Sequence, residues 1–224
     1  MGKVTVQRYT IDNPISLMGE EAGICWGAGT SDEEKNFRRG LHCLRDGHGR
    51  VEEYVQIFLT IEDYSARVIR ELYTHIGGAP TRLQESTRYV DCTNFTYMIP
   101  SSIDEDSKTL NIYNSLMKNI KESYAELEEA GVPKEDIANI LPLGMHTKIV
   151  LRTNLRNLID MAQQRLYNRA YWEYQDLMDN IIQQLSYYSD EWDYLVNYCN
   201  AFKRKCEVLG YCPESDSCGY MKNA

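Results

Sequence analysis

The chain has 224 residues, which is enough for one domain with a substantial hydrophobic core. Its formal net charge of -9 argues against a protein built to bind a nucleic-acid backbone. No apolar run approaches the roughly 18 residues of a membrane span, and the N-terminus lacks the apolar core of a signal peptide, so we expect a cytoplasmic protein that binds neither membrane nor nucleic acid.

The first part of the chain combines strand and helix patterns. Alternating apolar residues, a proline at a helix start and a capping-box pattern at Ser31 to Glu34 set the boundaries. The predicted elements are, in order, a strand from Val4 to Thr10, a helix from Asn13, a loop from Glu20 to Ser31, a helix ending at Gly47, a strand from Val55 to Ile61 and a helix from Ala66 that stops at Gly77. The last helix is expected to carry Tyr73 and Ile76 on its packed face.

The second part is more helical, because apolar residues recur at three- and four-residue steps over long segments. The predicted elements are a loop from Arg82 to Arg88, a strand from Asn94 to Ile99, a polar loop from Pro100 to Asp106, a helix from Leu110 to Leu127, a short helix from Pro133 to Leu141, a strand from Thr147 to Leu151 and helices that run on to about Lys205. Strands mixed with helices, without regular alternation of the two, predict an α+β fold with a mixed or antiparallel sheet flanked by long helices.

Two arginines stand out in the stretch from Ile140 to Leu177. On a helical wheel Arg169 falls among the apolar residues and Arg165 falls at their edge. Guanidinium groups that point toward a core need anionic partners. Two interpretations remain open: an internal ion-pair network, with Glu173 one turn from Arg169, or a pocket for a ligand whose phosphates match the arginine fork.

Seven cysteines, an odd number in a chain without a signal peptide, predict free thiols. Four of them lie near the C-terminus: Cys199, Cys206, Cys212 and Cys218. Their spacing of six or seven residues is looser than the pairs of roughly two to four residues that mark zinc sites. We therefore expect free thiols and no metal site, with a zinc site or a disulfide as the alternatives.

Two further stretches carry recognisable motifs. Thr74-His75-Ile76 is followed, after a glycine-rich turn, by QESTRY at Gln84 to Tyr89. The second stretch holds NLRNL at Asn154 to Leu158, then Arg165, then AYWE at Ala170 to Glu173. These blocks resemble the two signatures of the flavin-dependent thymidylate synthase family, which are Arg-His-Arg followed by Ser-x-Asn-Glu-x-Ser-x-Arg-Tyr, and Asn-x-Arg-x-Leu with a following Arg and Ala-x-Trp-Glu.

The resemblance covers about residues 22–177 and implies the family's fold and reaction. The family converts dUMP to dTMP: methylenetetrahydrofolate supplies the carbon, and NADPH reduces a bound FAD that delivers the hydride. Members are homotetramers whose active sites draw on several subunits. For this chain the resemblance implies a methyltransferase of nucleotide biosynthesis. We divide the chain accordingly into a single catalytic domain, residues 1–205, and a cysteine-containing tail, residues 206–224.

On the nucleotide side, the resemblance assigns five residues. Arg88 matches the arginine that binds the nucleotide phosphate, and Arg165 matches the arginine that hydrogen-bonds the uracil ring and polarises it for reaction at C5. The others are substrate-contacting positions: Ser86 matches a motif serine, Gln84 stands where the family has Glu, and Glu71 stands where it has Gln. Arg165 is the predicted catalytic residue, because a fixed, partly desolvated guanidinium stabilises negative charge that develops on the ring.

On the cofactor side, the resemblance assigns eight positions to FAD: Cys25, His48, Glu53, His75, Asn154, Arg156, Asp160 and Arg169. Three of them differ from the family, where Cys25 is a serine, Asp160 an asparagine and Arg169 a histidine. For His48 an alternative stays open, because a histidine directly after a helix-ending glycine is also placed to interact with the helix dipole.

Three arginines of the family's anion site are absent. Thr74 and Ile76 replace both arginines of the first triplet, and Ala138 stands where an arginine precedes Leu-Pro. Their loss removes charge-assisted hydrogen bonds that are each worth ~1.5–3 kcal/mol. Four other cations are candidates to restore the charge from new positions: Arg82, Lys148, Arg152 and Arg169.

Three functions are compatible with these features. The first, which we favour, is a flavin-dependent thymidylate synthase. The second is a related flavoenzyme that places a different one-carbon group, such as hydroxymethyl, on a pyrimidine nucleotide. The third is a non-catalytic relative that binds a nucleotide or a flavin.

Overall fold

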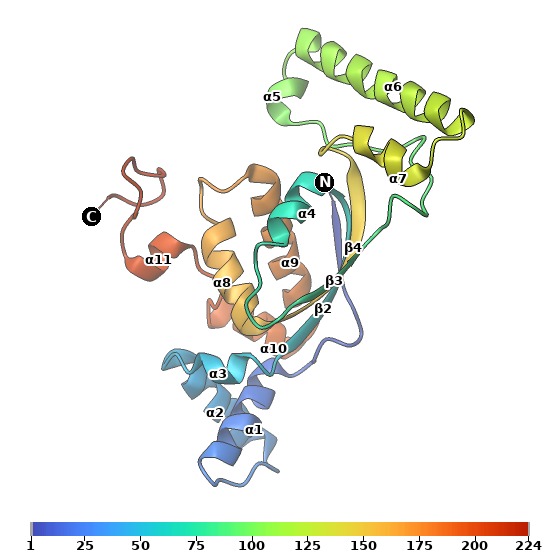
Figure 1. The fold of residues 1–224 in the computed structure, drawn as a ribbon. Coiled ribbons are helices and arrows are strands. Elements are labelled where there is room, and N and C mark those ends of the chain that lie inside the picture. Colours follow the sequence, from blue (N-terminus) through green and yellow to red (C-terminus); the bar gives the residue numbers. More distant parts are fainter. Residues whose placement is uncertain (1, 224) are drawn as a thin grey trace.

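Four antiparallel strands form the centre of the structure, a computed structural model that describes residues 2–223 (Figure 1). In sheet order they are β1 (Lys3–Val6), β2 (Gln56–Ser65), β4 (His146–Asn154) and β3 (Thr81–Gln84). Helices accompany the sheet without alternating regularly with its strands, which confirms the predicted α+β class.

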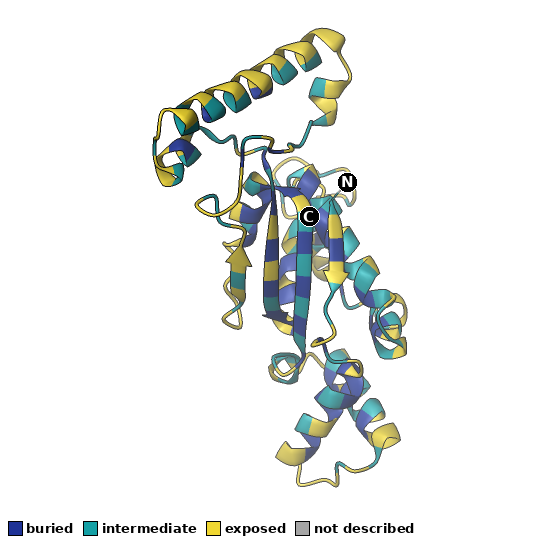
Figure 2. Cartoon of the chain, turned by 90° about the vertical axis from the view of Figure 1, so that its right-hand side faces the viewer, coloured by how far each residue is buried: buried dark blue, intermediate teal, exposed yellow. Residues whose placement is uncertain are grey.

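The sheet has one covered face and one bare face, because side chains alternate along each strand. Ile57, Leu59 and Ile61 of β2 are fully buried, and their partners on β4 point the same way. This confirms the half-buried strand that the sequence predicts here. Helices α8 (Leu155–Arg165) and α9 (Trp172–Ser186) cover this face. Figure 2 looks onto the other face, which no helix among residues 2–223 covers.

The bare face of the sheet exposes apolar side chains. Phe58 and Val150 project from β2 and β4, and Leu83 of β3, which pairs with Val150, is 70% exposed. Together with Arg152 they line a shallow, mainly apolar cavity of about 280 Å³. Exposed apolar side chains that lie together in this way make the bare face a candidate surface for contact with another protein.

Three helices pack at one end of the sheet: α1 (Pro14–Cys25), α2 (Glu33–Arg45) and α3 (Gly49–Glu52). The first two cross in close contact, since a Cβ on Gly19 would lie only 1.8 Å from the carbonyl oxygen of Asn36. The loop predicted from Glu20 is therefore wrong as far as Cys25, because this contact keeps the segment helical. Asp32, rather than Ser31, caps α2.

Helix α4 (Ala66–Leu72) is shorter than predicted. Tyr73 and Ile76, which the sequence placed on its packed face, lie beyond its end, and Ile76 is 74% exposed. A turn follows at Gly77-Gly78, where Gly78 has φ +66°. The prediction is wrong for these two side chains, because the glycine turn rather than the apolar spacing decides where the chain leaves the core.

Two strand predictions need correction in the next segment. The loop predicted from Arg82 contains β3, whose backbone pairs with the edge of β4. The strand predicted from Asn94 to Ile99 is reduced to a single bridge between Tyr97 and Met145. Both outcomes depend on whether a pairing edge is within reach, which local sequence does not encode.

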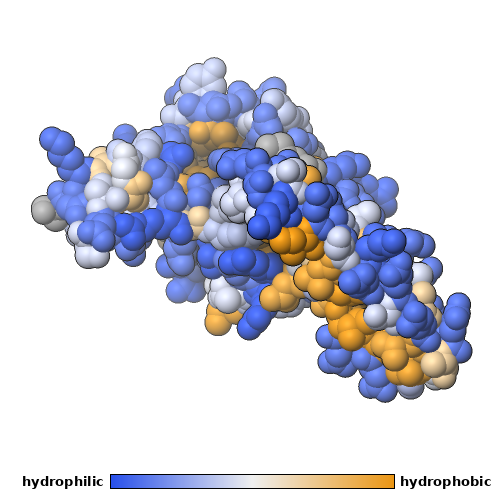
Figure 3. Space-filling view, turned by 90° about the horizontal axis from the view of Figure 1, so that it is seen from above, coloured by the Kyte–Doolittle hydropathy of each residue, from blue (hydrophilic) through white to orange (hydrophobic). Residues whose placement is uncertain are grey.

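An arm of helices projects from the opposite end of the sheet (Figure 1). It consists of α5 (Ser101–Asp104), α6 (Ser107–Glu129), α7 (Lys134–Ile137) and a 3₁₀ turn (Ala138–Ile140). The predicted long and short helices are confirmed, and α5 interrupts the polar loop predicted before them. A separate small core holds the arm together around Phe95, Met117 and Tyr124. Hydrophobic side chains also gather on its surface (Figure 3), where Ile112 and Leu116 are 62% and 53% exposed.

The helix predicted after β4 breaks at Arg165. Residues 166–171 form a loop, so the helical wheel does not apply to Arg169. This arginine is exposed, and its Nη2 donates a hydrogen bond to the carbonyl oxygen of Asp216 at 2.7 Å. The proposed ion pair between Arg169 and Glu173 is therefore wrong.

Beyond this loop the chain is helical in pieces, rather than continuously to about Lys205. The pieces are α9, α10 (Asp190–Asp193), a π-helical turn (Tyr194–Tyr198) and α11 (Lys205–Leu209). The division into a domain and a tail at residue 205 stays a prediction, and Met1 and Ala224 lie outside the described residues. Across residues 2–223, no helix is both long and apolar enough to cross a membrane.

Glu173 is fully buried and joins α9 to the end of β2. Its carboxylate accepts hydrogen bonds from the Ser65 backbone N–H at 2.7 Å and from the Ser65 hydroxyl at 2.6 Å. The same hydroxyl caps α4 by accepting the Val68 N–H at 3.2 Å. One buried carboxylate thus fixes the start of the helix on which Glu71 lies.

We predict that Glu173→Ala lowers the free energy of unfolding by about 2–4 kcal/mol, because it leaves the Ser65 N–H and hydroxyl without their partner in the core. Chemical denaturation measures the change. Glu122→Ala is the matched control, since it removes an exposed carboxylate paired with Lys118 and should shift stability by less than about 0.5 kcal/mol. Equal losses in the two variants would contradict the structural role of Glu173.

Candidate functional site

Arg165 is the centre of a group of polar side chains on and after α4. Its Nη1 donates to the Glu71 carboxylate at 3.0 Å, and its Nε donates to His75 Nε2 at 2.9 Å. Its Nη2 lies 3.5 Å from the Thr74 hydroxyl. We call Glu71, Thr74, His75 and Arg165 the arginine cluster. These partners hold the planar guanidinium in one orientation while 20% of the Arg165 side chain stays exposed.

His75 is neutral in this arrangement. A guanidinium has only donors, so the His75 Nε2 that meets Arg165 carries the lone pair and the ring proton sits on Nδ1. Burial, reinforced by the charges of Arg165 and Arg82, lowers the pKa of His75 to about 4. The imidazole therefore orients Arg165 as a hydrogen-bond acceptor and adds no charge of its own near neutral pH.

Tyr174 and Arg82 complete the surroundings of the arginine cluster. The guanidinium carbon of Arg165 lies 4.5 Å from the centre of the Tyr174 ring, a cation–π contact. Arg82 donates to the carbonyl oxygen of His75 at 2.5 Å. The Tyr174 hydroxyl and Arg82 Nε are buried without a hydrogen-bond partner in the described part of the chain. Buried polar atoms left unpaired beside a charged group are positions where a bound molecule can complete the bonding.

A pocket of about 260 Å³ opens where the turn after His75 meets the start of α8. We call it the glycine pocket; its lining residues are Glu53, Gly77, Gly78, Asn154, Arg156, Asn157 and Asp160. Four of these residues, Glu53, Asn154, Arg156 and Asp160, are predicted cofactor positions. The fold thus brings together residues from two separate segments that the resemblance assigned to one ligand, and the glycine turn adds a third segment to the lining.

Close packing shapes the wall of the glycine pocket. A Cβ on Gly78 would lie 2.0 Å from Asn154 Nδ2. Asn154 Oδ1 caps α8 by accepting the Asn157 N–H at 2.9 Å, which leaves its Nδ2 as a donor. Arg156 Nη1 lies 2.5 Å from the carboxylate of Glu53. The wall therefore offers both hydrogen-bond donors and carboxylate acceptors.

His48 and Cys25 lie toward helices α1 to α3, outside the pocket lining. The exposed ring of His48 meets the ring of Trp26 edge to face, with centres 6.5 Å apart, and its side chain makes no capping bond to α3. Gly49 follows His48, and a Cβ on Gly49 would lie 3.4 Å from Arg156 Nε. His48 therefore borders the pocket through its neighbour, whereas Cys25 is exposed one residue before Trp26.

The predicted phosphate-binding residues lie on a different part of the surface. Residues 85–90 follow β3, and we call them the outer loop. Arg88 is exposed there, with its Nε 2.9 Å from the carboxylate of Glu135 on the arm. The Ser86 hydroxyl accepts the Arg88 N–H at 3.3 Å. Arg88 thus faces solvent and the arm, and Ser86 bonds within the outer loop rather than to the arginine cluster.

Within one chain, the predicted nucleotide residues therefore fall into two groups. Glu71 and Arg165 belong to the arginine cluster, whereas Ser86 and Arg88 belong to the outer loop, with Gln84 at the end of β3 before it. Strand β3 spans about 10 Å at ~3.4 Å per residue, and it separates the turn after the cluster from the outer loop. No hydrogen bond or ion pair within residues 2–223 joins Arg88 to Arg165.

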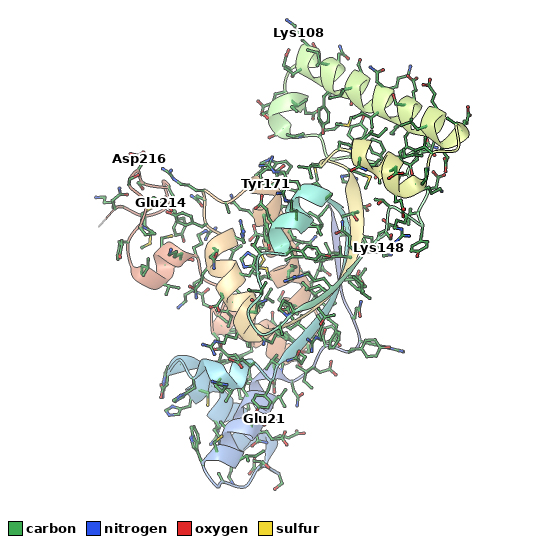
Figure 4. All side chains as sticks on the ribbon, in the orientation of Figure 1. Glu21, Lys108, Lys148, Tyr171, Glu214 and Asp216 are labelled. Atoms are coloured by element: carbon green, nitrogen blue, oxygen red, sulfur yellow. The ribbon has the colours of Figure 1, made fainter. Side chains whose placement is uncertain are left out.

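Of the four cations considered as replacements for lost arginines, Arg82 is the one beside the arginine cluster. Arg152 donates to a backbone carbonyl in the turn before β3 at 2.8 Å. Lys148, labelled in Figure 4, pairs with Glu62 at 2.6 Å. Arg169 is held by the tail, so it lines neither the cluster nor the pocket.

Sequence reasoning missed two residues of the site. Asn157 lies in the glycine pocket, and the Tyr174 ring packs against Arg165. Asn157 lies within the NLRNL motif block and Tyr174 directly follows the AYWE block, so their closeness to the motifs could have identified them as site residues. The helical wheel could not place Tyr174 beside Arg165, because the chain leaves the helix after Arg165 and forms a loop.

Comparison with known proteins finds one family model and several relatives. Residues 6–187 match the Thy1 model, described as thymidylate synthase complementing protein. The chain is 30% identical over 192 residues to the flavin-dependent thymidylate synthase of Thermococcus onnurineus, covering 84% of this chain and 76% of that protein. For proteins of the same description, identity is 29% over 230 residues in Pyrococcus furiosus (96% and 91% covered) and 27% over 244 residues in Clostridium tetani (97% and 93% covered).

We predict that His75 makes folding sensitive to mild acid. Its folded pKa, about 4, lies below its ordinary 6.5, so the stability it contributes is complete above about pH 6.5 and is lost as pH falls toward 4. Between about pH 7.5 and 5 the wild type should lose about 2 kcal/mol more than His75→Asn, at ~1.36 kcal/mol per pKa unit.

Urea unfolding at the two pH values provides the measurement, and NMR titration of the wild-type imidazole provides a check that does not depend on the variant. Parallel pH profiles for the two proteins, or a His75 ring already protonated at about pH 5.5, would show that Arg165 does not hold a neutral imidazole.

Proposed function

The chain belongs to the Thy1 family and is a flavin-dependent thymidylate synthase with FAD as its cofactor, and we propose that its arginine cluster and glycine pocket form one half of an active site that a second copy completes. The family's reaction implies dUMP as the substrate, with methylenetetrahydrofolate and NADPH as co-substrates. Bound FAD supplies the hydride chemistry, while the protein binds, orients and shields the reactants.

We assign the uracil ring of the nucleotide to Arg165. Glu71 and His75 hold its guanidinium, and Tyr174 packs against one face, so the group is both fixed and partly desolvated. Fixed donors aimed at developing negative charge stabilise a transition state more than mobile ones, because no reorganisation is needed during the reaction. Arg165 thereby polarises the ring for reaction at C5.

We assign part of FAD to the glycine pocket. The carboxylates of Glu53 and Asp160 line it beside the donors of Asn154 and Arg156. Carboxylates repel phosphates but accept hydrogen bonds from hydroxyl and imide groups. Gly78 lets the turn pass close to Asn154 in this wall, and a side chain there would push the turn and Asn154 apart. The ribityl chain or the ring edge of FAD therefore fits the pocket better than its pyrophosphate.

The glycine pocket is too small for the whole cofactor. Its volume of about 260 Å³ lies below the ~300–1,000 Å³ of sites for drug-sized ligands, and FAD is larger than such ligands. The remainder needs a surface outside the pocket. We propose that another copy supplies it, in the homotetramer that the family resemblance implies.

The bare face of the sheet is the surface that we assign to this contact. It is apolar around Leu83 and Val150 and hollowed by a cavity of about 280 Å³. Strand β3 forms its edge and leads directly into the outer loop. We propose that the assembled copies bring Ser86 and Arg88 of one chain past this edge toward Arg165 of another, since no hydrogen bond or ion pair joins Arg88 to Arg165 within residues 2–223 of one chain.

Arg88 is our candidate for the nucleotide phosphate. Its ion pair with Glu135 joins side chains that are 62% and 56% exposed, so water screens the pair and it contributes at most about 1 kcal/mol. Breaking it to bind a phosphate therefore costs little. Arg82, with its buried and unpaired Nε, compensates for the positive charge that Thr74 and Ile76 have removed.

The observation that carries this proposal is that Arg165 meets Glu71 and His75, far away in sequence, at 3.0 and 2.9 Å. Tritium release from C5 of dUMP, with methylenetetrahydrofolate, FAD and NADPH present, tests the function, and product mass identifies the one-carbon group. A product with the mass of dTMP supports the proposal. A hydroxymethylated product, or no release from flavin-loaded protein, would contradict it.

Gly78→Ala should weaken FAD binding by about tenfold or more, equivalent to ~1.4 kcal/mol, because its Cβ would lie 2.0 Å from Asn154 Nδ2. Gly131→Ala is the matched control: Gly131 has φ +79° and no atom within 4 Å of an added Cβ, so it carries similar backbone strain without the contact. Fluorescence titration of FAD compares them. Similar affinities for the two variants would exclude the glycine pocket as the FAD site.

Arg165→Lys and Arg88→Lys should each lower kcat/KM by about 10²–10³, because lysine cannot reproduce the forked donors. If one site uses Arg165 and Arg88 from different copies, randomly mixed oligomers recover about a quarter of wild-type activity, since half of the sites keep Arg165 and half of those keep Arg88. Arg70→Lys, on the exposed side of α4, should retain full activity. A mixture as inactive as its components would place both arginines in one chain's site.

A further inference from the structure

Three cysteines of the tail gather around Tyr167, in the loop between α8 and α9. Cys206 is fully buried, Cys212 is 2% exposed, and Cys218 is partly exposed. All seven cysteines of the chain are free thiols in the structure. The cluster lies apart from the glycine pocket and the outer loop, so the proposed reaction does not use it.

Two hydrogen bonds converge on the sulfur of Cys212. The Tyr167 hydroxyl lies 2.9 Å from Cys212 Sγ, and the backbone N–H of Cys218 donates to the same sulfur at 3.3 Å. Burial, then hydrogen bonds to both Cys212 and Cys218, raises the pKa of Tyr167. Cys212 and Cys218 therefore both lie beside Tyr167, with the backbone of Cys218 against the Cys212 sulfur.

The cysteines of the cluster differ in reactivity. Burial by itself raises the pKa of Cys212, but hydrogen bonds from Tyr167 and from the backbone N–H groups of Cys218 and Glu214 outweigh it and bring the pKa to about 7. Burial raises the pKa of Cys206 instead. A thiol that ionises near neutral pH, next to a more accessible second thiol, is typical of redox-active pairs.

We propose that Cys212 and Cys218 form a dithiol redox site that hydrogen peroxide converts to a disulfide, and that this bond stiffens the tail where it holds the loop after Arg165. Cys212 attacks first, because Tyr167 and the Cys218 N–H stabilise its thiolate. Cys218 resolves the intermediate, because its backbone lies against the Cys212 sulfur and its side chain is more accessible than that of the fully buried Cys206. Cys206 stays reduced in the buried core of the cluster.

The reaction needs no other co-reactant. The Cys212 thiolate attacks one oxygen of the peroxide, the O–O bond breaks, and the departing hydroxide takes a proton to become water, leaving a sulfenic acid. The Cys218 thiol attacks the sulfenic sulfur and expels a second water as the S–S bond forms. Two thiols lose two electrons and two protons, which reduce one peroxide to two waters. A dithiol reductant reverses the bond by exchange.

The tail contacts the loop through carbonyl groups inside the segment that the disulfide would close. Asn168 Nδ2 lies 3.3 Å from the carbonyl oxygen of Cys218, and Arg169 Nη2 lies 2.7 Å from that of Asp216. Figure 4 labels Asp216 on this tail, beside α8. Closing a ring over residues 212–218 removes freedom from these acceptors, so the loop that begins after Arg165 should open less often.

Peptide mapping of the full chain tests the pairing. The reduced protein is treated with equimolar hydrogen peroxide, alkylated and digested with a protease that cleaves after glutamate. Cleavage after Glu207 and Glu214 places Cys206, Cys212 and Cys218 on separate peptides. The expected product links the peptide of Cys212 to that of Cys218. A link that includes Cys206, or oxidation of Cys212 no faster than that of the partly exposed Cys199, would overturn the proposal.

Two variants separate the roles. In Cys218→Ser the reaction should stop at a sulfenic acid on Cys212 that dimedone traps; trapping on another cysteine would contradict the assignment. Tyr167→Phe should slow oxidation at pH 7 about fivefold, as expected when a pKa near 7 rises by about one unit. Cys199→Ser is the control and should leave the rate unchanged.

Hydrogen exchange tests the mechanical part of the proposal without reference to flavin or activity. Oxidised protein should exchange amides in residues 166–171 at least about threefold more slowly than reduced protein, while the arm exchanges equally in both. Unchanged exchange in this loop would show that the disulfide forms without holding it. The result stands whether or not the chain binds dUMP, so its failure is distinct from failure of the proposed enzyme function.

Discussion

The guanidinium of Arg165 is held by hydrogen bonds to a carboxylate and to a neutral imidazole, and the candidate site depends on that constraint. Glu71 supplies the carboxylate from α4, whose start is fixed by the contact of Ser65 with Glu173. His75 supplies the imidazole from the turn that follows. The buried carboxylate of Glu173 therefore influences the orientation of Arg165 indirectly, because it fixes the start of the helix on which Glu71 lies.

The same turn creates the second part of the site. Directly after His75, Gly77 and Gly78 pass close to the amides of Asn154 and Asn157, which leaves the glycine pocket beside the arginine cluster. The cluster that we assign to the nucleotide and the pocket that we assign to part of FAD are thus neighbours, because both are formed at this turn. The outer loop lies beyond β3 from both, and we therefore propose that the reaction requires assembly of copies.

The sequence was most informative where a pattern is local. Alternation of apolar and polar residues along β2 correctly predicted which face of this strand is buried. The family resemblance also assigned to one ligand four residues that line a single pocket in the structure. Local sequence could not predict three tertiary features. These are the pairing of β3 with the edge of β4, the end of the helix at Arg165, and the hydrogen bond of Arg169 to the tail. Each depends on a partner remote in sequence, so periodicity alone leads to the wrong element or the wrong face.

The central claim is that the nucleotide site exists only in the assembled protein. Binding of dUMP by the flavin-loaded chain can be measured over a dilution series while mass photometry follows the oligomer. Binding that is coupled to assembly should weaken as the oligomer dissociates, and dUMP should in turn stabilise the oligomer. A monomer that binds dUMP with undiminished affinity would contradict the claim, because Arg88 and Arg165 could then not need two copies to meet.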